Sequence, residues 1–184
     1  MHKLLRSLKG QMSRLQQAHF RHALYYERVA RKTTSLYQQG ADFVHQALSL
    51  FDTEWENISH GQAWAASRAA ENDDAAKLCS KYPDAGVYCL TLRQHPRDRI
   101  QWFEAALTAA RKLRDRRAES YRLGNIGLAY AHLGETRHAI EYHHAALVIA
   151  RQLADLEGQE AFLTNLGLGY RAVGDYDSAI SHHG

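Results

Sequence analysis

The sequence has little cysteine, little proline and no long run of apolar residues. Two cysteines in 184 residues, Cys79 and Cys89, are too few for a disulfide framework or a zinc site. Two prolines and 12 glycines are too few for a disordered or loop-rich chain. No apolar stretch approaches the ~20 residues that a membrane-spanning helix needs. These absences predict a folded, reduced, cytoplasmic protein without a membrane span.

Motifs that carry catalysis are also missing. The carboxylates are scattered, no serine or cysteine stands in a nucleophile motif, and no G-x-x-x-x-G-K-[ST] loop occurs. We therefore predict that the chain is not an enzyme and has no catalytic residues and no cofactor.

Histidine, by contrast, is abundant, with 12 residues. His138 and His143 are five apart and do not share a helical face. His19 and His22 do share one, but no carboxylate or cysteine joins them, and zinc needs three or four converging ligands. We predict no metal site.

A repeat dominates the second half of the chain. The stretch NIGLAYAHLGETRHAIEYHH, which starts at Asn125, returns 40 residues later as NLGLGYRAVGDYDSAISHHG, which starts at Asn165. A fixed period of 20 to 50 residues indicates an array of stacked structural units. Alanine and leucine are common and β-branched residues scarce, which favours helices as the building blocks.

The apolar spacing predicts pairs of helices. Residues 118–133 form a first helix that Gly134 ends, and a second helix starts at Glu135 or Thr136. Asp155 to Gly158 are expected to form the turn into the next pair, in which Gly174 is the equivalent stop. An eroded earlier copy begins at Pro96, after a helix over 75–93 that Pro83 should break or kink near Tyr82–Asp84. Further upstream, helical spacing indicates helices over 12–38, 41–51 and 53–70, the last with a capping box at Thr53 to Glu56.

The predicted fold is an all-α, right-handed solenoid of stacked antiparallel helix pairs. We divide it into a basic N-terminal helix (1–38), divergent helical pairs (39–94) and regular repeats (95–184), the last of them truncated. Because Gly184 falls inside a second helix, either the chain is a fragment of a longer protein or its C-terminal edge pairs with another copy. We expect self-association through that edge.

The repeat resembles the tetratricopeptide pattern. Gly127, Tyr130 and Gly134, followed by Ala139 and Ala146, stand at the spacings of that motif. The period of 40 in place of 34 is similar to the subfamily of kinesin light chains and LGN-type adaptors. The resemblance implies a protein-interaction scaffold or sensor that binds a peptide or partner on its concave face.

A looser resemblance covers the N-terminal half. The segments FDTEWENISHGQAWA and AAKLCSKYPDAGVYCLTLRQHPRDRIQWFEAAL look like the helical region before the repeats of bacterial signal-transduction ATPases of the NB-ARC type. Since the ATPase motifs are absent from this chain, the resemblance implies a sensor part without the motor.

The tetratricopeptide resemblance also implies site residues. In the 40-residue subfamily an asparagine on the first helix holds the backbone of an extended peptide, and an amide side chain can both donate and accept there. The matching positions are Asn125 and Asn165. Packing between helices is an equally good explanation for both. Residues on the same face complete the predicted site: Tyr88, Tyr121, Leu128, His132, Leu168 and Arg171.

The basic N-terminus supports an alternative function. Residues 1–37 carry eight Lys or Arg and only one acid, Glu27. This segment could contact nucleic acid, lie on an anionic membrane, or form a solvated helix face. A nucleic-acid-associated regulator is therefore the alternative to the protein-binding scaffold, although we rank nucleic acid below a protein partner.

Overall fold

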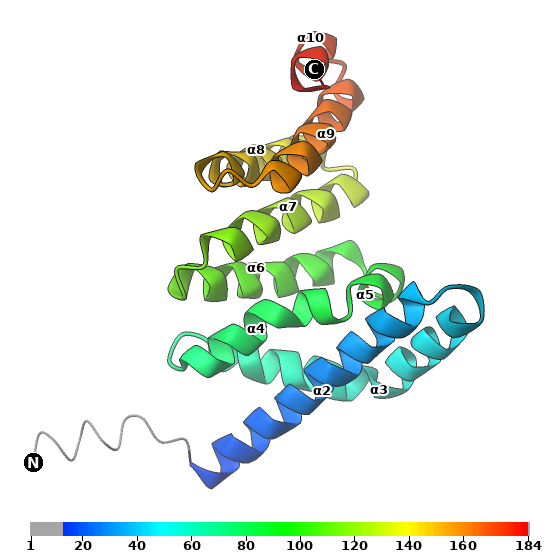
Figure 1. Ribbon diagram of the computed structural model, residues 1–184, viewed down its shortest axis with the longest axis vertical. Coiled ribbons are helices and arrows are strands. Elements are labelled where there is room, and N and C mark those ends of the chain that lie inside the picture. Colours follow the sequence, from blue (N-terminus) through cyan, green and yellow to red (C-terminus); the bar gives the residue numbers. More distant parts are fainter. Residues whose placement is uncertain (1–12, 184) are drawn as a thin grey trace, which may run out of the picture.

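The computed structural model describes residues 13–183, with side chains to residue 179. Within this range the chain forms nine helices and no strand, and the helices stack in chain order (Figure 1). They are α2 (Arg14–Gln38), α3 (Ala41–Arg68), α4 (Asp73–Ala85), α5 (Val87–Arg93), α6 (Pro96–Lys112), α7 (Arg116–His132), α8 (Thr136–Gln152), α9 (Leu156–Ala172) and α10 (Tyr176–His183). The all-α solenoid of consecutive helix pairs is confirmed.

The repeat boundaries follow from local capping. Gly134 and Gly174 have φ angles of 76° and 82°, in the left-handed region that glycine adopts without strain, and they end α7 and α9 as predicted. Asp115 and Asp155 stand before these two helices. Their carboxylates accept hydrogen bonds from amides three residues later, at 3.0 and 3.3 Å. Each regular pair thus starts on aspartate and turns on glycine.

The predicted turn over Asp155 to Gly158 is wrong. Asp155 caps α9, and the residues after it form the first helical turn. The chain instead reverses one residue earlier, at Ala154, whose φ of 52° lies in the left-handed region. Arg114 has the same role between α6 and α7, with a φ of 56°. A polar residue that caps a helix looks like a turn residue in the sequence, since the same side chains favour both.

Of two helix breaks expected in the first half, one is absent and the other lies a few residues later in the chain. The helices expected over 41–51 and 53–70 are one continuous helix, α3, and Thr53 donates to the carbonyl oxygen of Ser49 inside it instead of capping. Pro83 is buried within the last turn of α4, and the helix ends two residues after it, at Ala85. The chain bends at Gly86, between α4 and α5.

The helix that begins the described region has a strong start signal. The Ser13 hydroxyl accepts from the Gln16 amide at 3.2 Å, and the Gln16 side chain accepts from the Ser13 amide at 2.8 Å. This reciprocal capping box fixes the first turn of α2. The predicted helix began at Met12, which lies outside the described residues.

Two buried clusters fill the stack, and α6 contributes to both. The N-terminal cluster gathers around Phe51, Ile58 and Tyr82, and the tyrosine hydroxyl donates to the Ala23 carbonyl at 2.7 Å. The C-terminal cluster gathers around Ile126, Leu147 and Leu166. The side chains of α6 divide between them: Trp102, Ala105 and Ala109 pack in the first, whereas Ile100, Phe103 and Leu107 belong to the second.

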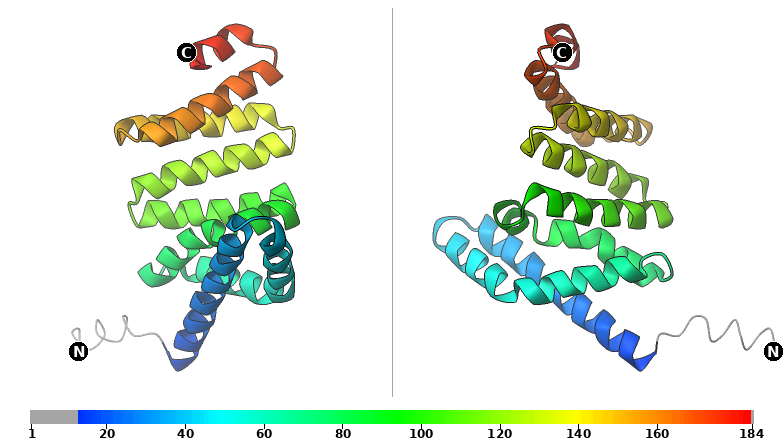
Figure 2. Two further views of the ribbon diagram at one scale, coloured as in Figure 1. Left: turned by 45° about the vertical axis from the view of Figure 1, so that its right-hand side comes forward. Right: turned by 180° about the vertical axis from the view of Figure 1, so that it is seen from behind.

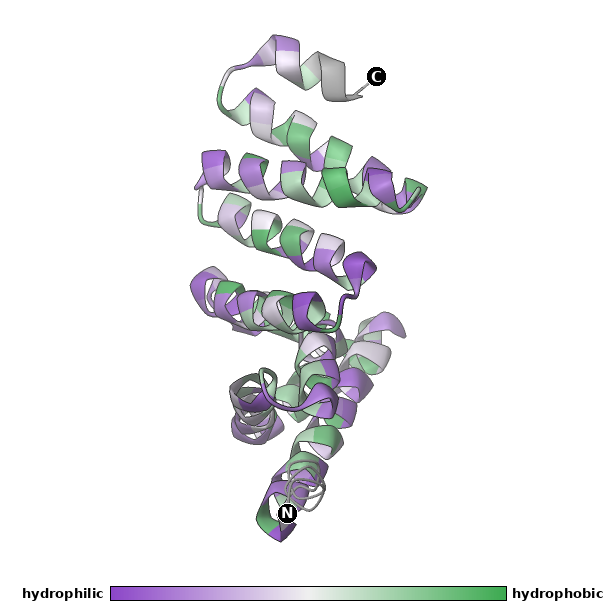
Figure 3. Cartoon of the chain, turned by 90° about the vertical axis from the view of Figure 1, so that its left-hand side faces the viewer, coloured by the Kyte–Doolittle hydropathy of each residue, from purple (hydrophilic) through white to green (hydrophobic). Residues whose placement is uncertain are grey.

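Each helix is therefore apolar on some sides and polar on others. Figure 3 shows hydrophobic and hydrophilic positions alternating along the stacked helices, as expected where one side meets a neighbour and another meets water. No helix in the described region is long and apolar enough to cross a membrane.

His143 occupies the centre of the C-terminal cluster. Its ring is 2% exposed, lies against Gly127 and stacks on Phe162 with ring centroids 6.4 Å apart. Only a glycine fits opposite it, because a Cβ on residue 127 would lie 2.9 Å from the imidazole. Burial, and next the neighbouring His144, lower the pKa of His143 from 6.5 to about 4. The side chain is thus a neutral core residue.

Candidate peptide-binding face

The first helices of the two regular pairs, α7 and α9, keep one side free of other described helices, and this side continues onto the α4–α5 bend, which α2 partly covers. We call it the first-helix face (Figures 1 and 2). Three apolar side chains stand at equivalent positions on it, 40 residues apart. Tyr88, Leu128 and Leu168 are exposed by 37%, 39% and 52%. Leu128 and Leu168 are thus left partly in water at the same position of two adjacent repeats, whereas Tyr88 shares the spacing but lies on the short helix α5 beside α2.

A groove of about 540 Å³ crosses this face between the α4–α5 bend and α7. The predicted site residues Tyr121 and Asn125 both line it. The residues that line it beside them are Asp84, Val87, Asp115, Arg117, Ala118 and Arg122. The groove therefore combines an aromatic ring, an amide and paired charges, which suits a ligand with both polar and apolar parts.

The charges of the groove are internally paired. The buried guanidinium of Arg122 holds the half-exposed carboxylate of Asp84 through two hydrogen bonds, one of them 2.6 Å from Nη1 to Oδ1. Arg117 lies over the Tyr121 ring, 5.8 Å from its centroid, and 3.7 Å from the Asp155 carboxylate. The Arg122–Asp84 pair fixes α7 against α4, and the Arg117–Asp155 pair joins α7 to the start of α9. Together they leave the groove without a strong net charge.

Asn125 and Asn165 are both half-buried on this face. In the described part of the chain, neither side-chain amide forms a hydrogen bond with another residue. An amide that served packing alone would be expected to bond to a neighbouring helix.

His132 and Tyr88 have partners of their own. The Nδ1 atom of His132 lies 2.9 Å from a guanidinium nitrogen of Arg99. Since a guanidinium can only donate, the imidazole accepts there. Burial lowers the pKa of Arg99, which has this histidine as its hydrogen-bond partner. The Tyr88 ring stacks on Tyr37 of α2 at 4.8 Å, so it is directed toward the N-terminal helix.

Leu168 and Arg171 line a smaller hollow of about 310 Å³ at the start of α10, together with Ala172 and Tyr176. Tyr176, which is 66% exposed, was not predicted as a site residue. Val87, Arg117 and Arg122, which line the groove, were not predicted either. Tyr176 could have been noticed, because the preceding repeat has Thr136 at this position and an aromatic ring there is a departure from the pattern.

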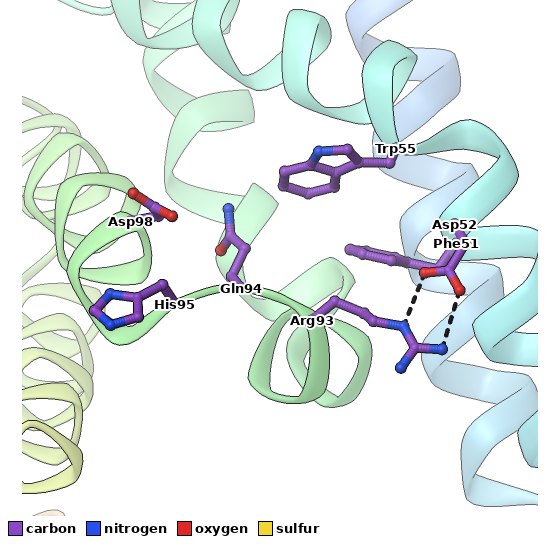
Figure 4. A pocket seen from close by; sticks show the side chains of 7 residues that line it. All are labelled: Phe51, Asp52, Trp55, Arg93, Gln94, His95 and Asp98. Atoms are coloured by element: carbon purple, nitrogen blue, oxygen red, sulfur yellow. Dashed lines mark hydrogen bonds and ion pairs between the residues drawn. The ribbon is translucent and has the colours of Figure 1, made fainter.

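A further hollow of about 330 Å³ lies beside the stack, between α3 and the α5–α6 connection (Figure 4). Phe51 and Trp55 form its apolar side, and Arg93 neutralises Asp52 through bonds of 2.9 and 3.0 Å. His95 and Asp98 are not joined by a hydrogen bond, and the His95 ring instead accepts from the backbone amide of Arg97. The hollow thus has no hydrogen-bonded pair of carboxylate and imidazole among its lining residues.

Metal and thiol chemistry find little support in the described residues. Among them, no three His, Cys, Asp or Glu side chains converge as metal ligands would. Both cysteines are buried, and burial raises the pKa of Cys79 to about 11 and also raises that of Cys89. A thiol protonated at neutral pH is a poor nucleophile.

The consecutive helix pairs define a helical-repeat protein, in which each pair packs mainly on its neighbours in the chain. Residues 123–157 and 163–184 match the sequence model of the tetratricopeptide repeat, so this part of the chain carries tetratricopeptide repeats. Such repeats generally mediate protein–protein interaction and are typically not catalytic. Among curated proteins, no relative matches the chain. The resemblance to signal-transduction ATPases rests on residues outside the matched segments and stays a hypothesis.

Proposed function

We propose that the chain binds an extended peptide segment of a partner protein along the first-helix face, and that it does so without catalysing a reaction. The repeated exposure of Leu128 and Leu168 at equivalent positions of adjacent repeats is the observation that carries this proposal, and Tyr88, at the same 40-residue spacing beside α2, extends it. Scattered apolar residues on a surface are ordinary, but a series at one repeat position is not.

The two asparagines add backbone recognition to this apolar series. Asn125 and Asn165 stand at equivalent places in adjacent repeats, and neither has a hydrogen-bond partner in the described structure. A peptide group offers one donor and one acceptor, which matches the two ends of a side-chain amide. An extended segment that passes both repeats would be held once by each amide.

The groove beside Asn125 gives the segment a place to lie. Tyr121 supplies an aromatic wall, and the Arg122–Asp84 pair forms a firm edge because the arginine is buried. Its charges are compensated, so apolar side chains of the partner, more than its charge, should decide affinity.

Selection of peptides tests the proposal. A random peptide library displayed on phage is selected on the full chain, and enriched peptides are measured by fluorescence anisotropy. The double variant Asn125→Ala and Asn165→Ala should weaken binding at least about fivefold, since each lost hydrogen bond contributes ~0.5–1.5 kcal/mol. Leu128→Ser with Leu168→Ser should also weaken it.

Matched controls separate the face from the rest of the surface. Gln101→Ala removes an exposed amide from α6, and Val148→Ser removes an exposed apolar side chain from α8. Both controls should bind normally. Peptides that bind the asparagine variant as well as the parent chain would refute backbone recognition. A loss of helicity in that variant would instead assign both asparagines to packing.

A further inference from the structure

We propose a second binding surface, on the outward side of α2, which holds a single-stranded nucleic acid through its phosphates and one stacked base. This surface is distinct from the first-helix face and does not depend on peptide binding. We call it the α2 ridge and define it by Arg14, Arg21, Arg28, Lys32 and Tyr25.

The ridge is a straight line of cations. At 100° per residue, Arg14, Arg21, Arg28 and Lys32 all point within about 40° of one another around α2. All four are exposed. The three arginines are seven residues apart, so they follow one another at about 10 Å, and the line from Arg14 to Lys32 is about 27 Å long.

These cations have no local counter-charges. No ion pair joins any of the four to a residue of the described structure. The only acid within α2 is Glu27, which is buried and pairs with Arg31 on another side of the helix. The sequence before α2 adds Lys3, Arg6 and Lys9 and no acid. Like charges in a row repel each other, so a bound polyanion would relieve this repulsion.

An aromatic ring lies within the line. Tyr25 is 60% exposed and stands between Arg21 and Arg28 on the same side of the helix. The Tyr25 and Tyr26 rings are nearly perpendicular, with their centroids 5.0 Å apart. This contact holds the Tyr25 ring against the helix and leaves much of it in water. Phosphate-binding cations around an aromatic platform are the combination that single-stranded nucleic acids require.

The packing of α2 argues against a membrane as the occupant. A helix that binds a bilayer surface inserts its apolar side among the lipids. The apolar side of α2, including Ala23 and Ala30, is already buried in the N-terminal cluster. The α2 ridge lies at the N-terminal end of the stack, where no further helix of the described chain covers it (Figures 1 and 2). An acidic peptide would satisfy the cations but would leave Tyr25 unused.

Fluorescence anisotropy with a labelled oligodeoxythymidine strand tests the proposal on the full chain. Between about 50 and 200 mM NaCl, the logarithm of the binding constant should fall with the logarithm of salt with a slope of about −3, because four phosphates are neutralised. The variant Arg14→Gln, Arg21→Gln, Arg28→Gln should lose most of this slope and most of the binding. Tyr25→Ala should weaken binding about tenfold and leave the slope unchanged.

A charge-matched control isolates the α2 ridge. Arg97→Gln, Arg137→Gln, Arg151→Gln removes the same charge from exposed positions on α6 and α8 and should bind as the parent chain does. Equal losses in the two triple variants, absence of binding at about 50 mM NaCl, or full binding after Tyr25→Ala would each overturn the proposal. Binding to phosphatidylglycerol vesicles without binding to the strand would overturn it too, in favour of a lipid surface.

Discussion

His143 should make the stability of the protein depend on pH between about 6.5 and 4. Its folded-state pKa is lowered, because the buried ring cannot easily accept a proton, whereas in the unfolded chain it titrates normally. Above pH 6.5 the ring is neutral in both states and contributes nothing to the pH dependence. As the pH falls below 6.5, the unfolded chain gains a proton that the folded protein refuses, so stability is lost.

The size of the effect follows from the two pKa values. The difference between the ordinary value of 6.5 and about 4 in the fold corresponds to about 3 kcal/mol at low pH, because one pKa unit is worth about 1.4 kcal/mol. About 1 kcal/mol should already be lost near pH 6, and about 2 kcal/mol near pH 5. Losses of this size are large for a protein of ordinary stability.

His143→Phe is the perturbation that isolates this group. Phenylalanine keeps an aromatic ring between Gly127 and Phe162 but cannot be protonated, and it removes a buried ring nitrogen, Nδ1, that has no hydrogen-bond partner among the described residues. At pH about 7.5 the variant should be within about 1 kcal/mol of the parent chain. At pH about 5 it should be the more stable of the two by about 2 kcal/mol.

Urea unfolding followed by circular dichroism at the two pH values measures both free energies. His60→Gln, a change of an exposed histidine on α3, controls for the loss of any imidazole. Carboxylates that also titrate in acid are common to all three chains and cancel in the comparison. If the parent chain and His143→Phe lose the same stability between the two pH values, the argument from burial is refuted.

Three more predictions follow from other contacts. Asp84→Asn should lower the free energy of unfolding by about 2 kcal/mol because it leaves Arg122 buried without its carboxylate, and adding Arg122→Met should restore most of the loss; additive losses in urea unfolding would contradict this. Gly134→Ala should destabilise by about 1 kcal/mol because its φ of 76° strains any residue with a Cβ, whereas Gly134→Asn should cost less, and equal midpoints for the two would argue against strain. The self-association expected from the sequence should appear in light scattering as a mass that rises with protein concentration, and a constant monomer mass would refute it.

The regular repeats could be predicted from the sequence because their signals are local. Gly134 and Gly174 end helices by their own conformational freedom, and the 40-residue period repeats the same small and large positions. The exposed positions of Leu128 and Leu168 follow from helical spacing once the first helices are placed. Local signals and tertiary structure agree in these repeats, so both the helix boundaries and the exposed positions could be predicted from the sequence.

Features that depend on distant partners could not be predicted in this way. Thr53 resembles a helix start, but in α3 it lies on an exposed side of a continuous helix, where its hydroxyl bonds to the preceding turn. The Arg122–Asp84 pair joins residues 38 positions apart and appears only when α7 packs on α4. The burial of His143 could not be predicted without knowing that Gly127 and Phe162 enclose its ring.

The division of the α6 side chains between the two buried clusters sets the order in which the helices can unfold. Loss of α7 to α10 would uncover Ile100, Phe103 and Leu107 on α6, while Trp102 and Ala109 would stay packed in the N-terminal cluster. Fraying that starts at α10 can therefore proceed pair by pair and halt at α6, leaving α2 to α6 as a residual folded body. Amide hydrogens of α9 should exchange with solvent sooner than those of α3, with α6 marking the boundary between the fast and the slow zone.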